Sequence, residues 1–176
     1  MRLLWWRDAL IALDAPAAPI PAEPLLQDIA ARLTATGLAG ASIAELEEGW
    51  AALLESETPG DAEIMAHGEG RGAALFAMSA ALLGAVPEEV GRAGEGWALA
   101  DVGHRLRDPA ACAFARARAA ERLAGVAIGR WPTALRPLGL LTIFARWDAA
   151  MPESEQRRQG APKRLLRALA YRLTGR

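Results

Sequence analysis

Residues 108–127 read Asp-Pro-Ala-Ala-Cys-Ala-Phe-Ala-Arg-Ala-Arg-Ala-Ala-Glu-Arg-Leu-Ala-Gly-Val-Ala, and this stretch indicates the fold most clearly. Proline loses no hydrogen bond in the first turn of a helix, and the acid before it favours the positive end of the helix dipole. Alanine gives up no side-chain freedom on entering a helix. The stretch therefore predicts a helix from Pro109 to about Ala127, with Asp108 as its cap.

The same composition extends over the whole chain. About 40 of the 176 residues are alanine, 52% are apolar and 23% are charged. β-Branched residues and tyrosine are scarce, which favours helix over sheet. The apolar fraction and the six tryptophans exclude a disordered chain. The length suits one domain, or one domain with an appendage.

Apolar residues recur at helical spacing between clear breaks, so we predict an all-α fold, a single bundle of about eight helices. Ser42 and Glu45 form a capping-box pattern, and Asp61 is a candidate cap. Pro87, followed by two glutamates, is expected in a first turn. Pro16, Pro19 and Pro21 predict an extended connector. Besides 109–127, the expected helices are 2–13, 23–36, 42–55, 61–84, one from 87, 138–150 and 161–173.

The charge is unevenly distributed along the chain. Residues 1–155 carry 13 basic and 21 acidic side chains, a formal charge of −8, whereas residues 156–176 carry seven basic side chains and no acid. We therefore predict two parts: an acidic helical domain over 1–155 and a basic amphipathic helix over 156–176.

Several classes of protein are excluded by simple counts. A single cysteine rules out a disulfide scaffold and a multi-cysteine zinc or iron–sulfur site, and two histidines argue equally against a histidine-rich metal centre. Arg7 and Asp8 interrupt the apolar N-terminal stretch, so it does not read as a signal peptide. There is no apolar run long enough for a transmembrane helix. The expected location is cytoplasmic.

One segment resembles a known family. Residues 2–10, Arg-Leu-Leu-Trp-Trp-Arg-Asp-Ala-Leu, are similar to a helix of bacterial proteins of the squalene/phytoene synthase family, especially its branch resembling respiratory-complex assembly factors. Further similarities follow in the family's order, at 43–54, 68–75, 94–99 and from 136. The resemblance implies part of the isoprenoid synthase fold, which surrounds an apolar cavity for prenyl chains.

The catalytic members of that family join two allylic diphosphates head to head. Magnesium ions held by carboxylates one helical turn apart on two facing helices neutralise the leaving diphosphate. The first aspartate-rich helix of the family precedes the Trp-Trp-Arg-Asp helix, and this sequence begins at the latter. At the place of the second motif stand Asp101 and Arg105, not two carboxylates. We therefore expect no prenyl-transfer activity and no cofactor.

The candidate remnant of a diphosphate or metal site consists of Asp101, His104, Arg105 and Asp108. The alternative interpretation is a solvated helix face with i,i+4 pairs, Asp101 with Arg105 and His104 with Asp108. We favour the second interpretation because the spacing explains itself without a ligand, and no residue is assigned as catalytic or as a metal ligand.

A second candidate set would form a cavity wall or a partner surface. The side chains of the two adjacent tryptophans point about 100° apart on a helix, so one can pack in the core while the other lines a cavity or contacts a partner. For the glycines, close packing of two helices is the better account. The set comprises Arg2, Trp5, Trp6, Arg7, Gly68, Gly72 and Trp97.

The basic tail gives a third candidate surface. Leu165, Leu166, Leu169 and Leu173 share one helical face, with cations on the other. Three interpretations are open: adsorption to an anionic membrane, docking on an acidic body of the same or a second chain, and a terminal bundle helix with a solvated basic face. The candidate contact residues are Lys163, Arg164, Arg167 and Arg172. Nucleic acid is the least supported partner and is not expected, because aromatics do not alternate with the cations and the rest of the chain is acidic.

Together these observations predict a squalene/phytoene synthase-like protein that acts by binding. It would be an assembly or scaffold factor for a membrane-associated enzyme, peripheral to the inner membrane, or a holder of an isoprenoid-like lipid. A homodimer or a protein partner is compatible with this role. The alternative is a Mg²⁺-dependent prenyltransferase that condenses allylic diphosphates and is completed by further N-terminal helices or a second subunit.

Overall fold

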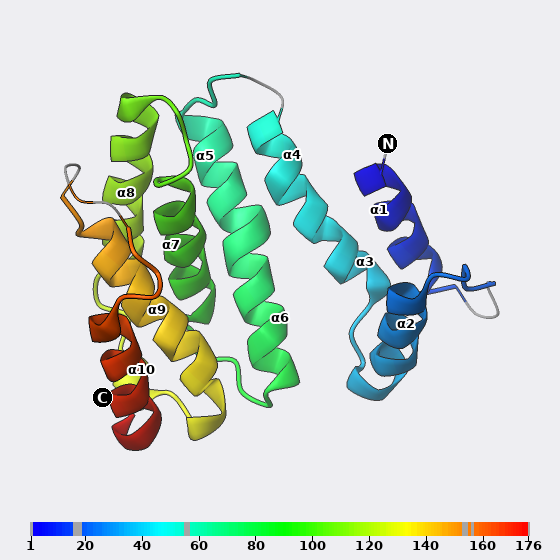
Figure 1. Cartoon of the computed structure of the whole chain (residues 1–176). Coiled ribbons are helices and arrows are strands. Elements are labelled where there is room, and N and C mark those ends of the chain that lie inside the picture. Colours follow the sequence, from blue (N-terminus) through cyan, green and yellow to red (C-terminus); the bar gives the residue numbers. More distant parts are fainter. Residues whose placement is uncertain (1, 16–18, 55–56, 153–154, 156, 176) are drawn as a thin grey trace.

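The computed structural model describes residues 2–15, 19–54, 57–152, 155 and 157–175, apart from the side chains of Arg2, Leu3 and Thr34. All regular structure in these ranges is helical (Figure 1). The predicted all-α class is therefore confirmed. Of the expected connector at 16–21, residues 16–18 lie outside the described residues, and residues 19–21 are not helical.

Several of the helical elements join end to end. α3, η1 and α4 form one rod, and α5, η2 and α6 form another, so that the described chain has eight continuous helices. The elements are α1 (Arg2–Ala12), α2 (Pro24–Thr36), α3 (Gly40–Ala44), η1 (Glu45–Glu47), α4 (Glu48–Leu54), α5 (Asp61–His67), η2 (Gly68–Ala73), α6 (Ala74–Leu82), α7 (Val90–Val102), α8 (Pro109–Leu123), η3 (Ile128–Arg130), η4 (Thr133–Leu135), α9 (Arg136–Ala149) and α10 (Pro162–Thr174).

Helix α7 lies at the centre of the main bundle, between the α5–η2–α6 rod, α8 and α9 (Figure 1). Two apolar clusters meet along it. One contains Ile64, Leu99 and Leu123, and the other contains Phe76 and Leu135. α10 packs on the outer side of α9.

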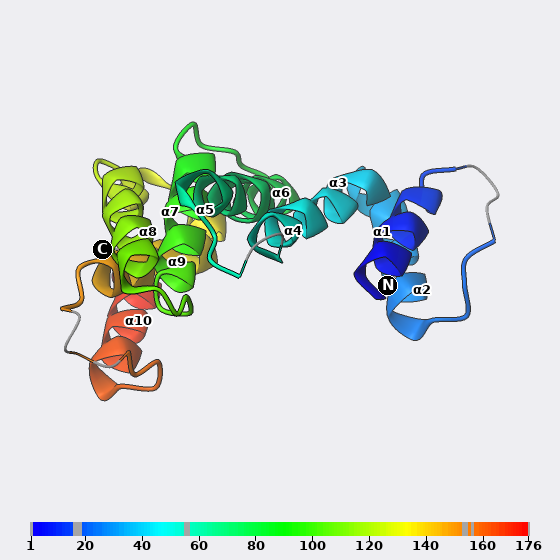
Figure 2. The same ribbon diagram turned by 90° about the horizontal axis from the view of Figure 1, so that it is seen from above.

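The N-terminal helices extend the molecule to one side. α1, α2 and α3 have a small core of their own, formed by Ala9, Leu10, Leu26 and Ala44. Seen from above, these helices lie at one end of an elongated molecule, and the α3–α4 rod links them to the main bundle (Figure 2).

The glycine-rich segment Gly68–Ala73 is a π-helix within the long rod. Two pairs of glycines bring backbones together there. Gly72 packs on Gly94 of α7, where a Cβ on either residue would collide with the other's carbonyl oxygen, and Gly70 lies against Gly49. The structure thus shows close helix packing at these glycines, which is the interpretation that their sequence pattern favours.

Three predicted helix starts are wrong by two or three residues, since α3 begins at Gly40, α7 at Val90 and α9 at Arg136. The amides of Gly40 and Ala41 donate to the Asp14 carboxylate at 2.6 and 2.8 Å, so α3 begins earlier than the Ser42–Glu45 capping box implied. The fifth helix begins at Val90, because Pro87 lies in a preceding turn whose carbonyl accepts from the Val90 amide. The predicted cap Asp61 is instead the first residue of α5, whose N-cap is Gly60.

The described helices include none that is both long and apolar enough to cross a membrane.

Candidate functional site

Asp101, in the last turn of α7, lies at the centre of a cluster of charged side chains. Arg105 Nε donates to Asp101 Oδ2 at 2.8 Å, as the i,i+4 spacing predicts. Arg157 Nη2, 56 residues further along the chain, donates to Oδ1 at 2.9 Å. Burial opposes ionisation, but the hydrogen bonds from Arg157 and Arg105 outweigh it and lower the pKa of Asp101. The carboxylate is thus ionised, and each of its oxygens accepts a hydrogen bond from an arginine.

Asp148, near the end of α9, is the second acid of the cluster and only 8% of its side chain is exposed. It accepts two hydrogen bonds from Arg164 of α10, at 2.5 and 3.3 Å, and lies 3.5 Å from Arg157. Arg157 therefore bridges Asp101 and Asp148. Through these bonds the basic tail is fixed to the acidic body of the same chain.

Of the predicted polar stripe, only Asp101 and Arg105 form an ion pair in the described structure. α7 ends at Val102, so His104, Arg105 and Asp108 lie beyond it, and the expected single helix face is not formed. His104 Nε2 lies 3.0 Å from the Asp148 backbone carbonyl, not on Asp108. Asp108 caps α8 by accepting from the Ala111 amide at 2.9 Å, as Pro109 indicated.

Next to this cluster, the side chain of Arg71 lies between two tryptophans. The Arg71 guanidinium carbon lies 4.5 Å from the ring centroid of Trp50 and 4.8 Å from that of Trp97. Its Nη1 is buried, with no hydrogen-bond partner in the described structure. Burial lowers the pKa of Arg71, and Asp101 partly offsets this. Trp97 also stacks on Phe76, so the ring serves the core as well as the cation.

A small cavity of about 220 Å³ lies beside these groups. Its lining contains both apolar and charged side chains. The lining residues are Trp97, Asp101, Leu141, Phe144, Ala145, Asp148, Arg157, Gln159 and Arg164.

A magnesium site of the type that the family resemblance implies does not fit these residues. Both oxygens of Asp101 accept hydrogen bonds from arginines, and a divalent cation would have to displace Arg105 or Arg157. Over the described ranges there is no group of three or more His, Cys, Asp or Glu side chains placed to hold a metal ion.

Helix α10 leaves its leucine face uncovered. Arg164, Ala168 and Tyr171 face α9, and Tyr171 is buried against Gly139. The opposite face presents four leucines to solvent: Leu165 at 63% exposure, Leu166 at 68%, Leu169 at 55% and Leu173 at 71%.

The four candidate cations of the tail occupy different positions around α10. Lys163 Nζ lies 5.3 Å from the ring centroid of Trp147, and Arg172 is exposed. Arg167 is half-buried. The sequence predicts Arg164 on a basic contact face, but its side chain is only 12% exposed and points at Asp148. We therefore remove Arg164 from the set of surface contacts.

The candidate residues of α1 are split between the core and the surface. Trp6 packs against the small N-terminal core, whereas Trp5 is 45% exposed and meets Trp6 edge to face at 5.3 Å. Arg7 Nη1 lies 3.9 Å from Glu47. Gly68 packs against Leu99. The side chain of Arg2 lies outside the described part of the structure.

No protein-family model, curated protein or solved structure matches this chain.

Proposed function

We propose that this chain is a non-catalytic binding protein of squalene/phytoene synthase type that attaches to a membrane surface through α10. It would act as an assembly or scaffold factor, held peripherally at the inner membrane, for an enzyme that works there.

The uncovered leucine face of α10 is the observation that carries this proposal. Burying a whole leucine side chain stabilises by roughly 1.5–3 kcal/mol, so four leucines on one face offer several kcal/mol of driving force. In the described fold they are 55–71% exposed, while Arg164, Ala168 and Tyr171 hold the opposite face on the bundle. A helix fixed in this way can lie in the plane of a bilayer interface without unfolding the protein.

Cations on the flanks of the leucine face favour an anionic surface. With about 100° of rotation per residue, Lys163 lies on one flank and Arg172 on the other. A basic residue near an anionic leaflet contributes about 1 kcal/mol. The acidic remainder of the chain is repelled by such a surface, which favours an orientation with α10 toward the lipid.

The pairing of Asp101 supports the non-catalytic part of the proposal. Ionisation of an allylic diphosphate needs carboxylates free to hold Mg²⁺, and Asp101 is held by Arg105 and Arg157 instead. No specific observation favours the alternative, a prenyltransferase.

A paired substitution tests the membrane contact. In flotation with vesicles containing phosphatidylglycerol, we expect the Leu166→Glu/Leu169→Glu variant to lose at least about tenfold in vesicle affinity, because it removes apolar area and adds two negative charges. The fraction of protein in the floating layer, measured against lipid concentration, gives the affinity.

Leu25→Glu/Leu54→Glu is the matched control, since Leu25 is 55% exposed and Leu54 is 70% exposed, both far from α10. It introduces the same charges and should keep wild-type binding. Equal losses in the two double variants would mean that net charge, not the leucine face, governs attachment, and full binding by the α10 variant would refute the proposal.

A further inference from the structure

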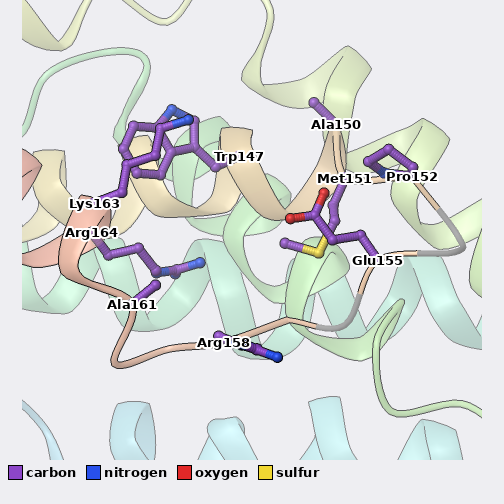
Figure 3. Close-up of a pocket in the computed structure, with 9 residues that line it drawn as sticks. All are labelled: Trp147, Ala150, Met151, Pro152, Glu155, Arg158, Ala161, Lys163 and Arg164. Carbon is purple, nitrogen blue, oxygen red and sulfur yellow. The ribbon is translucent and has the colours of Figure 1, made fainter.

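A second, larger pocket lies near the start of α10. It has a volume of about 720 Å³ and lies between the end of α9, the segment that follows it and the start of α10 (Figure 3). Trp147 and Met151 supply apolar walls. Arg158, Lys163 and Arg164 supply cations, and Glu155 supplies an acid. Pockets of this size hold small ligands.

Two of the three cations are available to a ligand. Arg164 is engaged with Asp148. Among the residues that the structure describes, no acid forms an ion pair with Arg158 or Lys163, which come from opposite sides of the pocket in Figure 3. Glu155 is the one described acid in the lining, so these three groups leave a net positive charge. Two cations in the lining of a concave site suit an anion with several acceptor oxygens.

The position of the pocket restricts the kind of anion. Lys163 precedes Leu166 by three residues, so it lies on nearly the same side of α10. In Figure 2, α10 lies at one side of the bundle, on the outer side of α9. When the leucine face enters a bilayer interface, the Lys163 side of the pocket is therefore at the level of the lipid headgroups.

We propose that this pocket binds the phosphate of a membrane phospholipid headgroup. Lys163 and Arg158 donate to the phosphate oxygens, and Trp147 and Met151 contact the apolar part of the lipid next to its glycerol. The negative charge of Glu155 repels the phosphate and weakens its binding. The inference rests on the membrane attachment proposed above and names the lipid group that would be recognised.

Vesicles with and without phosphatidylglycerol in phosphatidylcholine separate this site from general attraction. The wild type should prefer the anionic vesicles by about tenfold or more, on the scale of two basic side chains near an anionic surface. Lys163→Gln/Arg158→Gln should abolish most of this preference and keep the leucine-dependent binding. Glu155→Gln should strengthen anionic binding a few-fold.

Arg107→Gln/Arg130→Gln is the control, since both arginine side chains are exposed and lie outside the pocket. The two substitutions remove the same amount of positive charge. It should retain most of the preference. An equal loss of preference in the control, or a wild-type preference in Lys163→Gln/Arg158→Gln, would refute phosphate binding in the pocket.

A measurement without a membrane distinguishes the two proposals. Dihexanoyl-phosphatidylglycerol below its micellar concentration should shift the indole N–H resonance of Trp147, identified with Trp147→Phe, and Lys163→Gln/Arg158→Gln should remove the shift. Inorganic phosphate at the same concentration should shift it less. A shift without vesicle binding would refute membrane attachment alone, and vesicle binding without a shift would refute the pocket alone.

Discussion

Replacement of Asp148 by alanine is expected to lower the free energy of unfolding by about 3–5 kcal/mol, the cost of removing one partner from a buried ion pair. Asp148 is the acid that holds Arg164 and lies next to Arg157, and both arginine side chains are only 12–13% exposed. Without the acid, two cations remain close together at the base of α10. We therefore expect α10 to detach before the bundle unfolds.

Urea unfolding measures the first effect, and hydrogen exchange of the α10 amides measures the second. Asp28→Ala is the control: its carboxylate pairs with Arg32 at 2.8 Å on an exposed helix face, where such pairs contribute about 0.3–0.5 kcal/mol. A loss for Asp148→Ala no larger than that of the control would show that the cluster does not fix α10.

Gly94→Ala has the second large expected effect, a loss of about 3 kcal/mol at the upper end of the usual cost of overpacking. A Cβ at Gly94 would collide with the Gly72 carbonyl oxygen and lie 2.6 Å from the Phe76 Cβ. Backbone cannot move aside as the tip of a flexible side chain does. α7 would have to separate from the π-helix η2 that packs on it.

Gly91→Ala, in the same helix, is the matched control because its nearest neighbour is the Ala73 Cβ at 3.8 Å. Alanine is the better helix former, so this variant should gain up to about 1 kcal/mol. Thermal unfolding of both variants gives the comparison. A similar change in both would mean that the close approach of Gly72 and Gly94 contributes little to stability.

Local signals in the sequence predict the helices well. Asp108 before Pro109 indicates the start of α8 correctly, because a cap acts within one turn. The Asp101–Arg105 pair also follows from spacing within a short stretch. The predicted start of α3 is wrong for the same reason, since its cap is Asp14, which is 26 residues from Gly40.

The centre of the charged cluster could not be read from the sequence. Asp148 follows Trp147 in an apolar helix, and nothing local says that it will meet Arg157 and Arg164 across a loop. The available signal is that several acids, Asp148, Glu153 and Glu155, precede a basic segment with no acids of its own. It indicates pairing within the chain but does not identify the partner.

For the leucine face of α10, too, the sequence predicts the pattern but not the tertiary contact. The pattern at 165, 166, 169 and 173 predicts an apolar stripe correctly. Which stripe of a helix meets the bundle depends on the partner surface, and here Asp148 and Gly139 favour Arg164 and Tyr171 over the leucines. Burial of the leucines, the usual outcome for such a pattern, does not occur in the described fold.

A label on α10 tests most directly whether this helix enters the membrane interface. In a Cys112→Ser background, Leu169→Cys carries an environment-sensitive fluorophore, and Ala117→Cys, exposed on α8, carries the same label as the control. Addition of phosphatidylglycerol vesicles should shift the emission of the label at residue 169 to shorter wavelength and leave the label at residue 117 unchanged. Unchanged emission at residue 169, or equal shifts at both positions, would contradict the account.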